Sequence, residues 1–221
     1  PKFLLTTDTL HYDTRTSIAH IVGPSTITSG ESVIKSTSGY YDTNQENAQL
    51  LSRTTILNKE KEITGDSLYH DDRKGISEGF GNVIYTDRVN KNMMFCDYFW
   101  YNDKTGYAYA TKRAKLVDYS QKDTLYVHGD SIKMYTYNID TDSVWRKFHC
   151  FDKVRAYRVD VQAVCDSLVY DTKDSCMVMY KDPITWNENR QLLGEVIEVF
   201  IKDSTIDKAH IIGQALSVEQ I

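Results

Sequence analysis

Among the charged groups in this chain that could do chemistry, carboxylates are in excess, with 31 Asp and Glu residues against 26 Lys and Arg. Asp71 and Asp72 are adjacent, and two carboxylates that face one substrate can act as general acid and general base. Arg73 to Gly75 follow with the composition of a turn, so we interpret the pair as solvated turn residues. The motifs of serine hydrolases, zinc proteases and phosphate-binding loops do not occur in the sequence. We therefore predict a non-enzymatic protein with no catalytic residues.

Histidine and cysteine, the usual metal ligands, are scattered along the chain. The six histidines and four cysteines show no paired spacing typical of a zinc site. We predict no metal site and no cofactor. The cysteines are interpreted as small buried thiols, and one disulfide of open pairing is the alternative. They are Cys96, Cys150, Cys165 and Cys176.

A compact basic cluster is formed by Lys112, Arg113 and Lys115. Because guanidinium and ammonium groups pair with phosphate, one interpretation is a contact for an anionic head group or a partner. The other interpretation is a solvated strand face. The formal net charge is −5 and the isoelectric point about 5.7. That charge excludes a general nucleic-acid binder, since neutralising phosphates requires a basic surface.

These residues are placed by a repeated motif that reads small, acidic, any, apolar, any, Tyr, Asp. It occurs seven times, and neighbouring copies are 29 to 36 residues apart. A period of this length indicates a stack of supersecondary units that bury one continuous core. The tyrosine position falls at Tyr12, Tyr41, His70, Tyr101, Met134, Tyr170 and Val199.

Each copy has the period-two alternation of a β-strand, as at Leu168 and Tyr170. The apolar residues on either side of the small position are five apart, for example Ile63 and Leu68, so a flat strand would point them to opposite faces. Both reach one core only if the strand bends or bulges at the small–acidic pair. The acidic side chains are therefore interpreted as structural, accepting hydrogen bonds from backbone N–H groups that the bend frees.

A polar turn and a returning strand follow each copy. Residues 44–53 carry helix-favouring side chains, but their place in the repeat predicts a strand. The chain has no linker and no shift in composition, so we predict one all-β domain over residues 1–221. It would contain about seven strand-pair repeats of about 30 residues and about 14 or more strands.

This repeat resembles that of the OstA-like/LptA family, to which the periplasmic bridge protein of lipopolysaccharide transport belongs. The copies at Gly65–Asp71 and Cys165–Asp171 are the nearest to the family pattern. The pairs Tyr12-Asp13 and Tyr41-Asp42 also match it. The resemblance extends over nearly the whole chain.

The resemblance implies an elongated, open antiparallel β-jellyroll in which two sheets form a V. It implies a non-enzymatic periplasmic scaffold that binds lipid and shields the acyl chains of lipopolysaccharide during transport to the outer membrane. The implied partners are lipid A acyl chains and, end to end, other jellyroll proteins of the bridge or further copies of the chain. Any signal peptide would be already removed or outside this sequence.

The lining of the acyl-chain trough is expected at the apolar residues beside the bends. The alternative function is a structural or adhesive β-repeat module that binds protein or carbohydrate without lipid. A carbohydrate-active enzyme is disfavoured because no acidic pair stands apart from the repeat. The expected lining residues are Ile34, Ile63, Leu68, Met94, Phe99, Val127, Ile132 and Leu168.

Overall fold

The computed structural model describes residues 3–139, 141–187, 189–202 and 205–219. These residues form twenty strands and no helix, so they contain no helix with the length and apolar character of a membrane span. The strand number and the antiparallel pairing confirm the predicted fold class. The chain divides into two compact units, unit 1 (Pro1–Lys104) and unit 2 (Thr105–Ile221). The prediction of a single domain over residues 1–221 stays a prediction.

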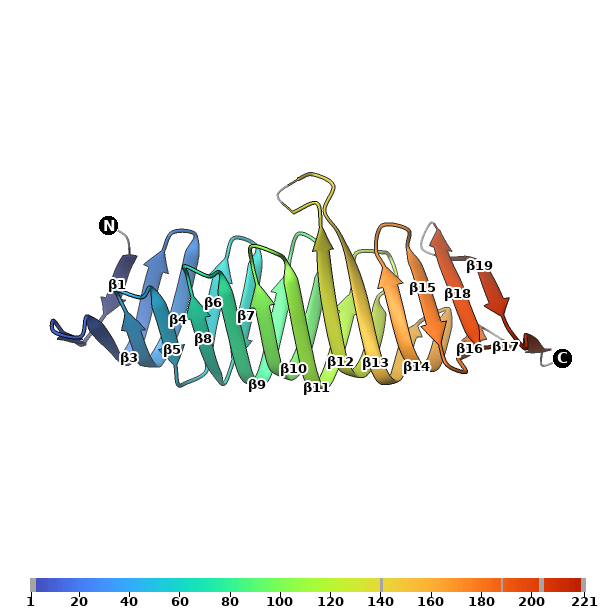
Figure 1. The fold of residues 1–221 in the computed structure, drawn as a ribbon, viewed down its shortest axis with the longest axis horizontal. Coiled ribbons are helices and arrows are strands. Elements are labelled where there is room, and N and C mark those ends of the chain that lie inside the picture. Colours follow the sequence, from blue (N-terminus) through green and yellow to red (C-terminus); the bar gives the residue numbers. More distant parts are fainter. Residues whose placement is uncertain (1–2, 140, 188, 203–204, 220–221) are drawn as a thin grey trace. The chain divides into compact units, whose positions relative to one another are not determined.

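Unit 1 holds the strands drawn from blue to green in Figure 1. Residues 44–53 form a turn and then β5, so the strand predicted from the repeat is confirmed over the helix-favouring composition. The strands are β1 (Phe3–Thr7), β2 (Leu10–Asp13), β3 (Ile18–Ser29), β4 (Ser32–Asp42), β5 (Asn47–Leu50), β6 (Thr54–Asn58), β7 (Lys61–Gly65), β8 (Ser67–Asp71), β9 (Ile76–Asp87) and β10 (Asn92–Asn102).

Unit 2 holds the strands drawn from green to red (Figure 1). The strands are β11 (Tyr107–Asp118), β12 (Leu125–Tyr137), β13 (Trp145–Arg158), β14 (Val161–Asp171), β15 (Cys176–Tyr180), β16 (Ile184–Asn187), β17 (Arg190–Leu193), β18 (Val196–Lys202), β19 (Thr205–Ile212) and β20 (Leu216–Glu219).

Each unit has two layers, because a long strand contributes one half to each. In β10, Met94 pairs with Tyr85 before the bend, and Phe99 pairs with Gly79 after it. The rings of Tyr85 and Phe99 are 5.2 Å apart between centroids, so the two halves pack face to face. We call the half containing Met94 and its neighbours the first layer, and the half containing Phe99 the second layer.

The strands bend at the small–acidic pair, as predicted. Ile63 and Leu68 lie on opposite sides of this point and are both buried. The extra residue, however, lies in the returning strand. Gly81 and Asn82, both left-handed with φ of 71° and 45°, face one residue of β10 in the register. Two residues opposite one constitute a β-bulge, which bends and twists the strand that carries it.

The acidic side chain of the bend packs against this bulge. Asp66 accepts hydrogen bonds from Asn82 Nδ2 (2.7 Å) and Arg53 Nη1 (2.8 Å). Its own backbone N–H donates to the Gly81 carbonyl at 2.9 Å. The structural role expected of this carboxylate is therefore observed at Asp66, but its donors there are side chains and not backbone N–H groups.

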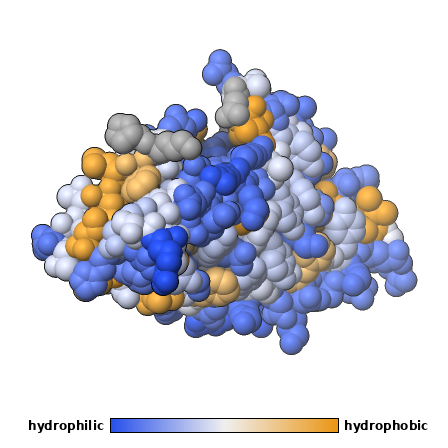
Figure 2. Space-filling model, turned by 60° about the vertical axis from the view of Figure 1, so that its left-hand side comes forward, coloured by the Kyte–Doolittle hydropathy of each residue, from blue (hydrophilic) through white to orange (hydrophobic). Residues whose placement is uncertain are grey.

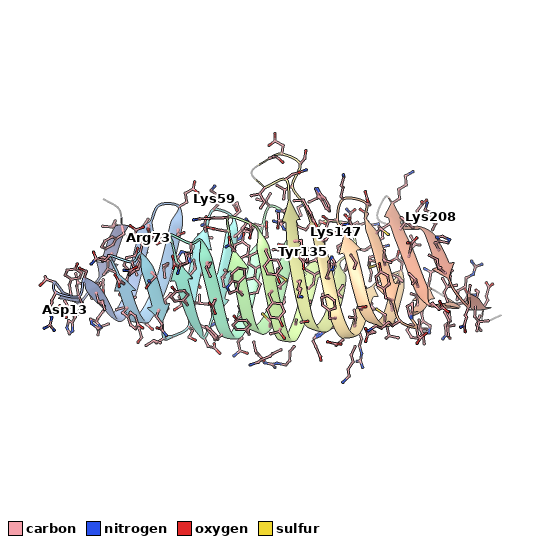
Figure 3. All side chains as sticks on the ribbon, viewed as in Figure 1. Asp13, Lys59, Arg73, Tyr135, Lys147 and Lys208 are labelled. Atoms are coloured by element: carbon pink, nitrogen blue, oxygen red, sulfur yellow. The ribbon has the colours of Figure 1, made fainter. Side chains whose placement is uncertain are left out.

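The second acidic position of the motif caps the turn that follows. Asp13 Oδ1 accepts the backbone N–H groups of Arg15 (2.8 Å) and Thr16 (3.2 Å). These two bonds hold the pKa of Asp13 below its usual value. Figure 3 shows Asp13 and, in a later turn of unit 1, Arg73, whose guanidinium donates to the Asn44 carbonyl.

The turns of unit 1 are also bonded to one another. The donor is the backbone N–H of the first residue after the motif. The acceptor is the carbonyl of the last residue of the preceding turn, about one repeat earlier in the sequence. The bonds run from Thr43 to Ser17 (3.0 Å), from Asp72 to Glu46 (3.0 Å) and from Asp103 to Gly75 (2.9 Å).

Candidate functional site

The eight residues expected to line a trough all lie between the two layers, with exposed fractions of 0–4 %. Unit 1 brings five of them together, and unit 2 brings together the other three. Those of the first layer are Ile34, Ile63, Met94 and Val127, and those of the second layer are Leu68, Phe99, Ile132 and Leu168.

In unit 1 the inner positions of the first layer form a row dominated by isoleucine. Cross-strand neighbours at these positions are large apolar side chains that contact one another along the layer. Sequence reasoning named three members of the row and missed those on the returning strands. The available signal there was the alternation of Thr or Ser with Ile. The row runs Ile27, Ile34, Ile56, Ile63, Tyr85 and Met94.

In unit 2 the side chains of the corresponding row become smaller along the first layer. Its members are again buried, but alanine and threonine replace isoleucine. Sequence reasoning named Val127 alone, because small side chains give a weak apolar signal. The row runs Leu116, Val127, Ala156, Ala163 and Thr185.

The interior has two unlike edges. At the corner edge, bent strands pass from one layer to the other. At the opposite edge, the side chains at the tyrosine position of the repeat contact polar side chains at the ends of first-layer strands. We call this edge the tyrosine edge. Tyr101 accepts a hydrogen bond from Lys61 Nζ at 2.8 Å. The Tyr170 hydroxyl is hydrogen-bonded to the Asp118 carboxyl. Sequence reasoning missed Lys61 and Asp118, because neither belongs to the repeated motif.

Burial shifts the pKa values of several groups at the tyrosine edge. Desolvation, with the nearby Asp72 carboxylate, raises the pKa of Tyr41 to about 12. Burial and the Asp118 carboxyl raise the pKa of Tyr170. Burial also raises the pKa of Asp118, against hydrogen bonds from Ser120 that favour its ionised form. Tyr41 and Tyr170 therefore keep their hydroxyl protons at pH 7 and can serve as hydrogen-bond donors.

The basic cluster lies away from the buried residues. Lys112 and Arg113 are exposed and form a left-handed bulge with φ of 60° each, at the corner edge of unit 2. Lys115 lies on the outer face of the first layer, opposite His128, which in turn pairs with Arg155. Burial and these two cations lower the pKa of His128.

The four cysteines are buried and free, as expected of small core residues. Burial raises the pKa of Cys165 to about 12 and that of Cys176 to about 11, so neither is a reactive thiolate at pH 7. Within the described ranges, no group of three or more His, Cys, Asp or Glu side chains could hold a metal ion.

Unit 1 presents apolar side chains on its outermost strands. Among the described residues, β1 and β2 have β3 as their partner strand. Leu4, Leu10 and Tyr12 on these strands are each about half exposed. On the face shown in Figure 2, hydrophobic side chains reach the surface in separate patches among hydrophilic ones. A strand that has one unpaired edge and exposed apolar residues is suited to pairing with another chain.

Comparison with known proteins gives one family match. Residues 2–66, which include β1 to β7, match the model of the family described as OstA-like protein. No curated protein matches the chain. One similar solved structure is LptH of Pseudomonas aeruginosa, described as the LptA homologous periplasmic component of the conserved lipopolysaccharide transport device. It is 14 % identical, and the match covers 73 % of this chain and 95 % of LptH with a TM-score of 0.32. Residues 2–66 are therefore similar to the OstA-like proteins, the family that the repeat resembles.

Proposed function

We propose that this protein is a non-enzymatic periplasmic scaffold that binds lipid and shields the acyl chains of lipopolysaccharide during transport to the outer membrane. The observation that carries the proposal is an apolar interior between two layers that bent strands join along the corner edge. The class of cargo is the one that the resemblance to the OstA-like/LptA family implies, and residues 2–66 match the model of the OstA-like proteins.

The physical basis is the transfer of acyl chains out of water. Each buried methylene contributes about 0.8 kcal/mol, so a chain of about twelve carbons gains roughly 10 kcal/mol. The interior is filled by its own side chains in the described structure. Loading therefore requires the layers to separate at the tyrosine edge, where each hydrogen bond contributes only about 1 kcal/mol.

The acyl chains would contact the eight inner residues on either side of the bends. Lys112, Arg113 and Lys115 would contact an anionic head group or a partner from the outer surface. The outermost strands of unit 1 would pair end to end with another jellyroll protein of the bridge or with a second copy.

Site-specific photocrosslinking in cells tests the proposal. A photoreactive residue at Ile63, Phe99 or Ile132 is expected to form an adduct with lipopolysaccharide. The adjacent positions on the same strands point to the outer face and serve as matched controls, which are expected to form none. These controls are Glu62 and Tyr98, both in unit 1.

Two outcomes would contradict the proposal. Adducts that are equally strong at inner and outer positions would indicate nonspecific adsorption. A folded protein without adducts at any inner position, and without co-purifying lipid A, would favour the structural or adhesive module instead.

A further inference from the structure

The outer face of the second layer in unit 2 carries a continuous chain of aromatic rings. The centroids of Tyr107 and Tyr135 are 5.3 Å apart, those of Tyr135 and His149 are 5.1 Å apart, and those of His149 and Phe151 are 6.4 Å apart. These four residues, which we call the ring chain, come from β11, β12 and β13 and are half-buried. Neighbouring rings are tilted by 41–65° against one another, so together they form an apolar platform of ring faces and edges on the sheet.

Two lysines border the ring chain. Lys133 lies over the Phe151 ring at 5.4 Å, and Lys147 pairs with Tyr135 in the register of β12 and β13. Figure 3 shows Tyr135 and Lys147 side by side. Lys147 is also bonded to Asp171 on the next strand, at 3.1 Å. Burial and the two lysines lower the pKa of His149, so the positive charge of this face comes from the lysines at pH 7.

Three polar side chains of this face, those of Tyr135, His149 and Lys133, are not used within the fold, whereas Lys147 is paired with Asp171. Among the described residues, the Tyr135 hydroxyl, the ring nitrogens of His149 and the Lys133 ammonium have no hydrogen-bond or ion-pair partner. On β11, β12 and β13, no outer residue of this layer is acidic among those described. A face of the fold that only supported the sheet would not need these unused donors and acceptors.

The same face of unit 1 differs in this respect. There, Tyr40, Gln49, Tyr69, Glu78 and Trp100 follow one another across the strands. The Tyr40 hydroxyl donates to Gln49, and the Tyr69 hydroxyl donates to Asp71 at 3.3 Å. The repeat therefore tolerates acidic and amide side chains here, so the fold does not require the lysines of unit 2.

We propose that the ring chain with Lys133 and Lys147 is a binding surface for an anionic oligosaccharide. The C–H faces of sugar rings stack on aromatic rings, and sugar hydroxyls can bond to Tyr135 and His149. Sugar carboxylate or phosphate groups pair with the two ammonium groups. A single-stranded nucleic acid fits less well, because the chain is acidic overall and offers no extended basic groove. A peptide could not add as a strand, because β12 is paired on both sides.

Calorimetric titration with a galacturonic-acid hexamer at low salt tests this surface, with a neutral glucose hexamer as the matched ligand. The wild-type protein is expected to bind the acidic hexamer, and added salt should weaken the binding. The double variant Lys133→Gln/Lys147→Gln should bind it at least about tenfold more weakly. Tyr135→Ala should weaken both hexamers, because it interrupts the platform.

Lys208→Gln is the control, because Lys208 also lies over a ring, Phe200 at 4.6 Å, on the same layer but on β19. It should leave binding unchanged. The proposal is overturned if the wild-type protein does not bind the acidic hexamer, or if the double variant binds it equally well. Equal binding of hexaglutamate or of a short single-stranded DNA would also overturn it, since the face would then select charge and not sugar.

Discussion

Units 1 and 2 are built from one repeat, yet the first-layer rows that face their interiors differ in size. In unit 1, Ile34, Ile56 and Ile63 are neighbours, whereas Ala156 and Ala163 are neighbours in unit 2. All five are buried. The repeat therefore determines which way a side chain points, while the volume between the layers is set residue by residue.

The largest effect is expected from removing volume in unit 1. Ile63→Ala should lower the free energy of unfolding by about 2–5 kcal/mol, because it deletes a fully packed side chain and leaves a cavity. Urea denaturation measures this. Thr64→Ala on the outer face of the same strand should cost much less, and equal losses would mean that the two faces do not differ in packing.

The converse substitution tests unit 2. Ala163→Ile should lower the free energy of unfolding by about 1–3 kcal/mol, because an added side chain overpacks a row that is already buried. Urea denaturation again gives the value. A neutral or stabilising result would show spare volume between the layers of unit 2, and would reverse the comparison with unit 1.

The tyrosine edges of the two units should respond unequally to loss of a hydroxyl. Tyr170→Phe should lower the free energy of unfolding by about 1–3 kcal/mol, because it leaves the buried Asp118 carboxyl without one of its donors. Tyr101→Phe should cost about 1 kcal/mol, because Lys61 is half-buried and can turn to water. Thermal unfolding of both variants tests this order, and a larger loss at Tyr101 would contradict it.

Asp118 should make the stability of unit 2 depend on pH. Because burial raises its pKa, the folded state holds the proton more tightly than the unfolded state. Its contribution is fully favourable below the unfolded pKa and is lost as pH rises through the folded pKa. Asp118→Asn should therefore gain stability relative to wild type as the pH rises above the usual pKa of an aspartate, as measured by urea denaturation at a series of pH values. A difference that does not change with pH would contradict this assignment.

The smallest effect is expected at the corner edge, where unit 2 has a non-glycine bulge. Arg113→Gly should raise the free energy of unfolding by up to about 1 kcal/mol, because glycine adopts positive φ without strain. Thr111→Gly, at a strand position of β11 before the bulge, should instead lower it by about 0.5–1 kcal/mol. Chemical denaturation measures both variants. A larger loss of stability in Arg113→Gly than in Thr111→Gly would contradict the expectation.

Much of the fold could be predicted from the sequence because every strand pair carries one copy of the repeated motif, which locates its first strand and the bend within it. The five-residue separation of Ile63 and Leu68 was enough to predict a bend. The bulged strand was not predictable, since Gly81 and Asn82 in unit 1 and Lys112 and Arg113 in unit 2 share a backbone conformation and no side-chain type.

The candidate site was predicted less completely for a similar reason. Alternation identifies inward residues such as Phe99, but the contact between Lys61 and Tyr101 joins residues 40 apart in sequence. Such a pair carries no local pattern. The ring chain of unit 2 was missed because aromatic residues on the outer face obey the same alternation as those of the core.

The bonds between successive turns give unit 1 a fixed repeat length. Every repeat adds two strands to each layer, so it lengthens a unit by about 10 Å, twice the spacing of neighbouring strands. A duplicated repeat would find the same backbone acceptor at the end of the turn before it and offer the same donor to the turn after it. Duplication of a repeat in the gene could therefore change the length of the unit by one repeat at a time, without changes to the side chains of the core.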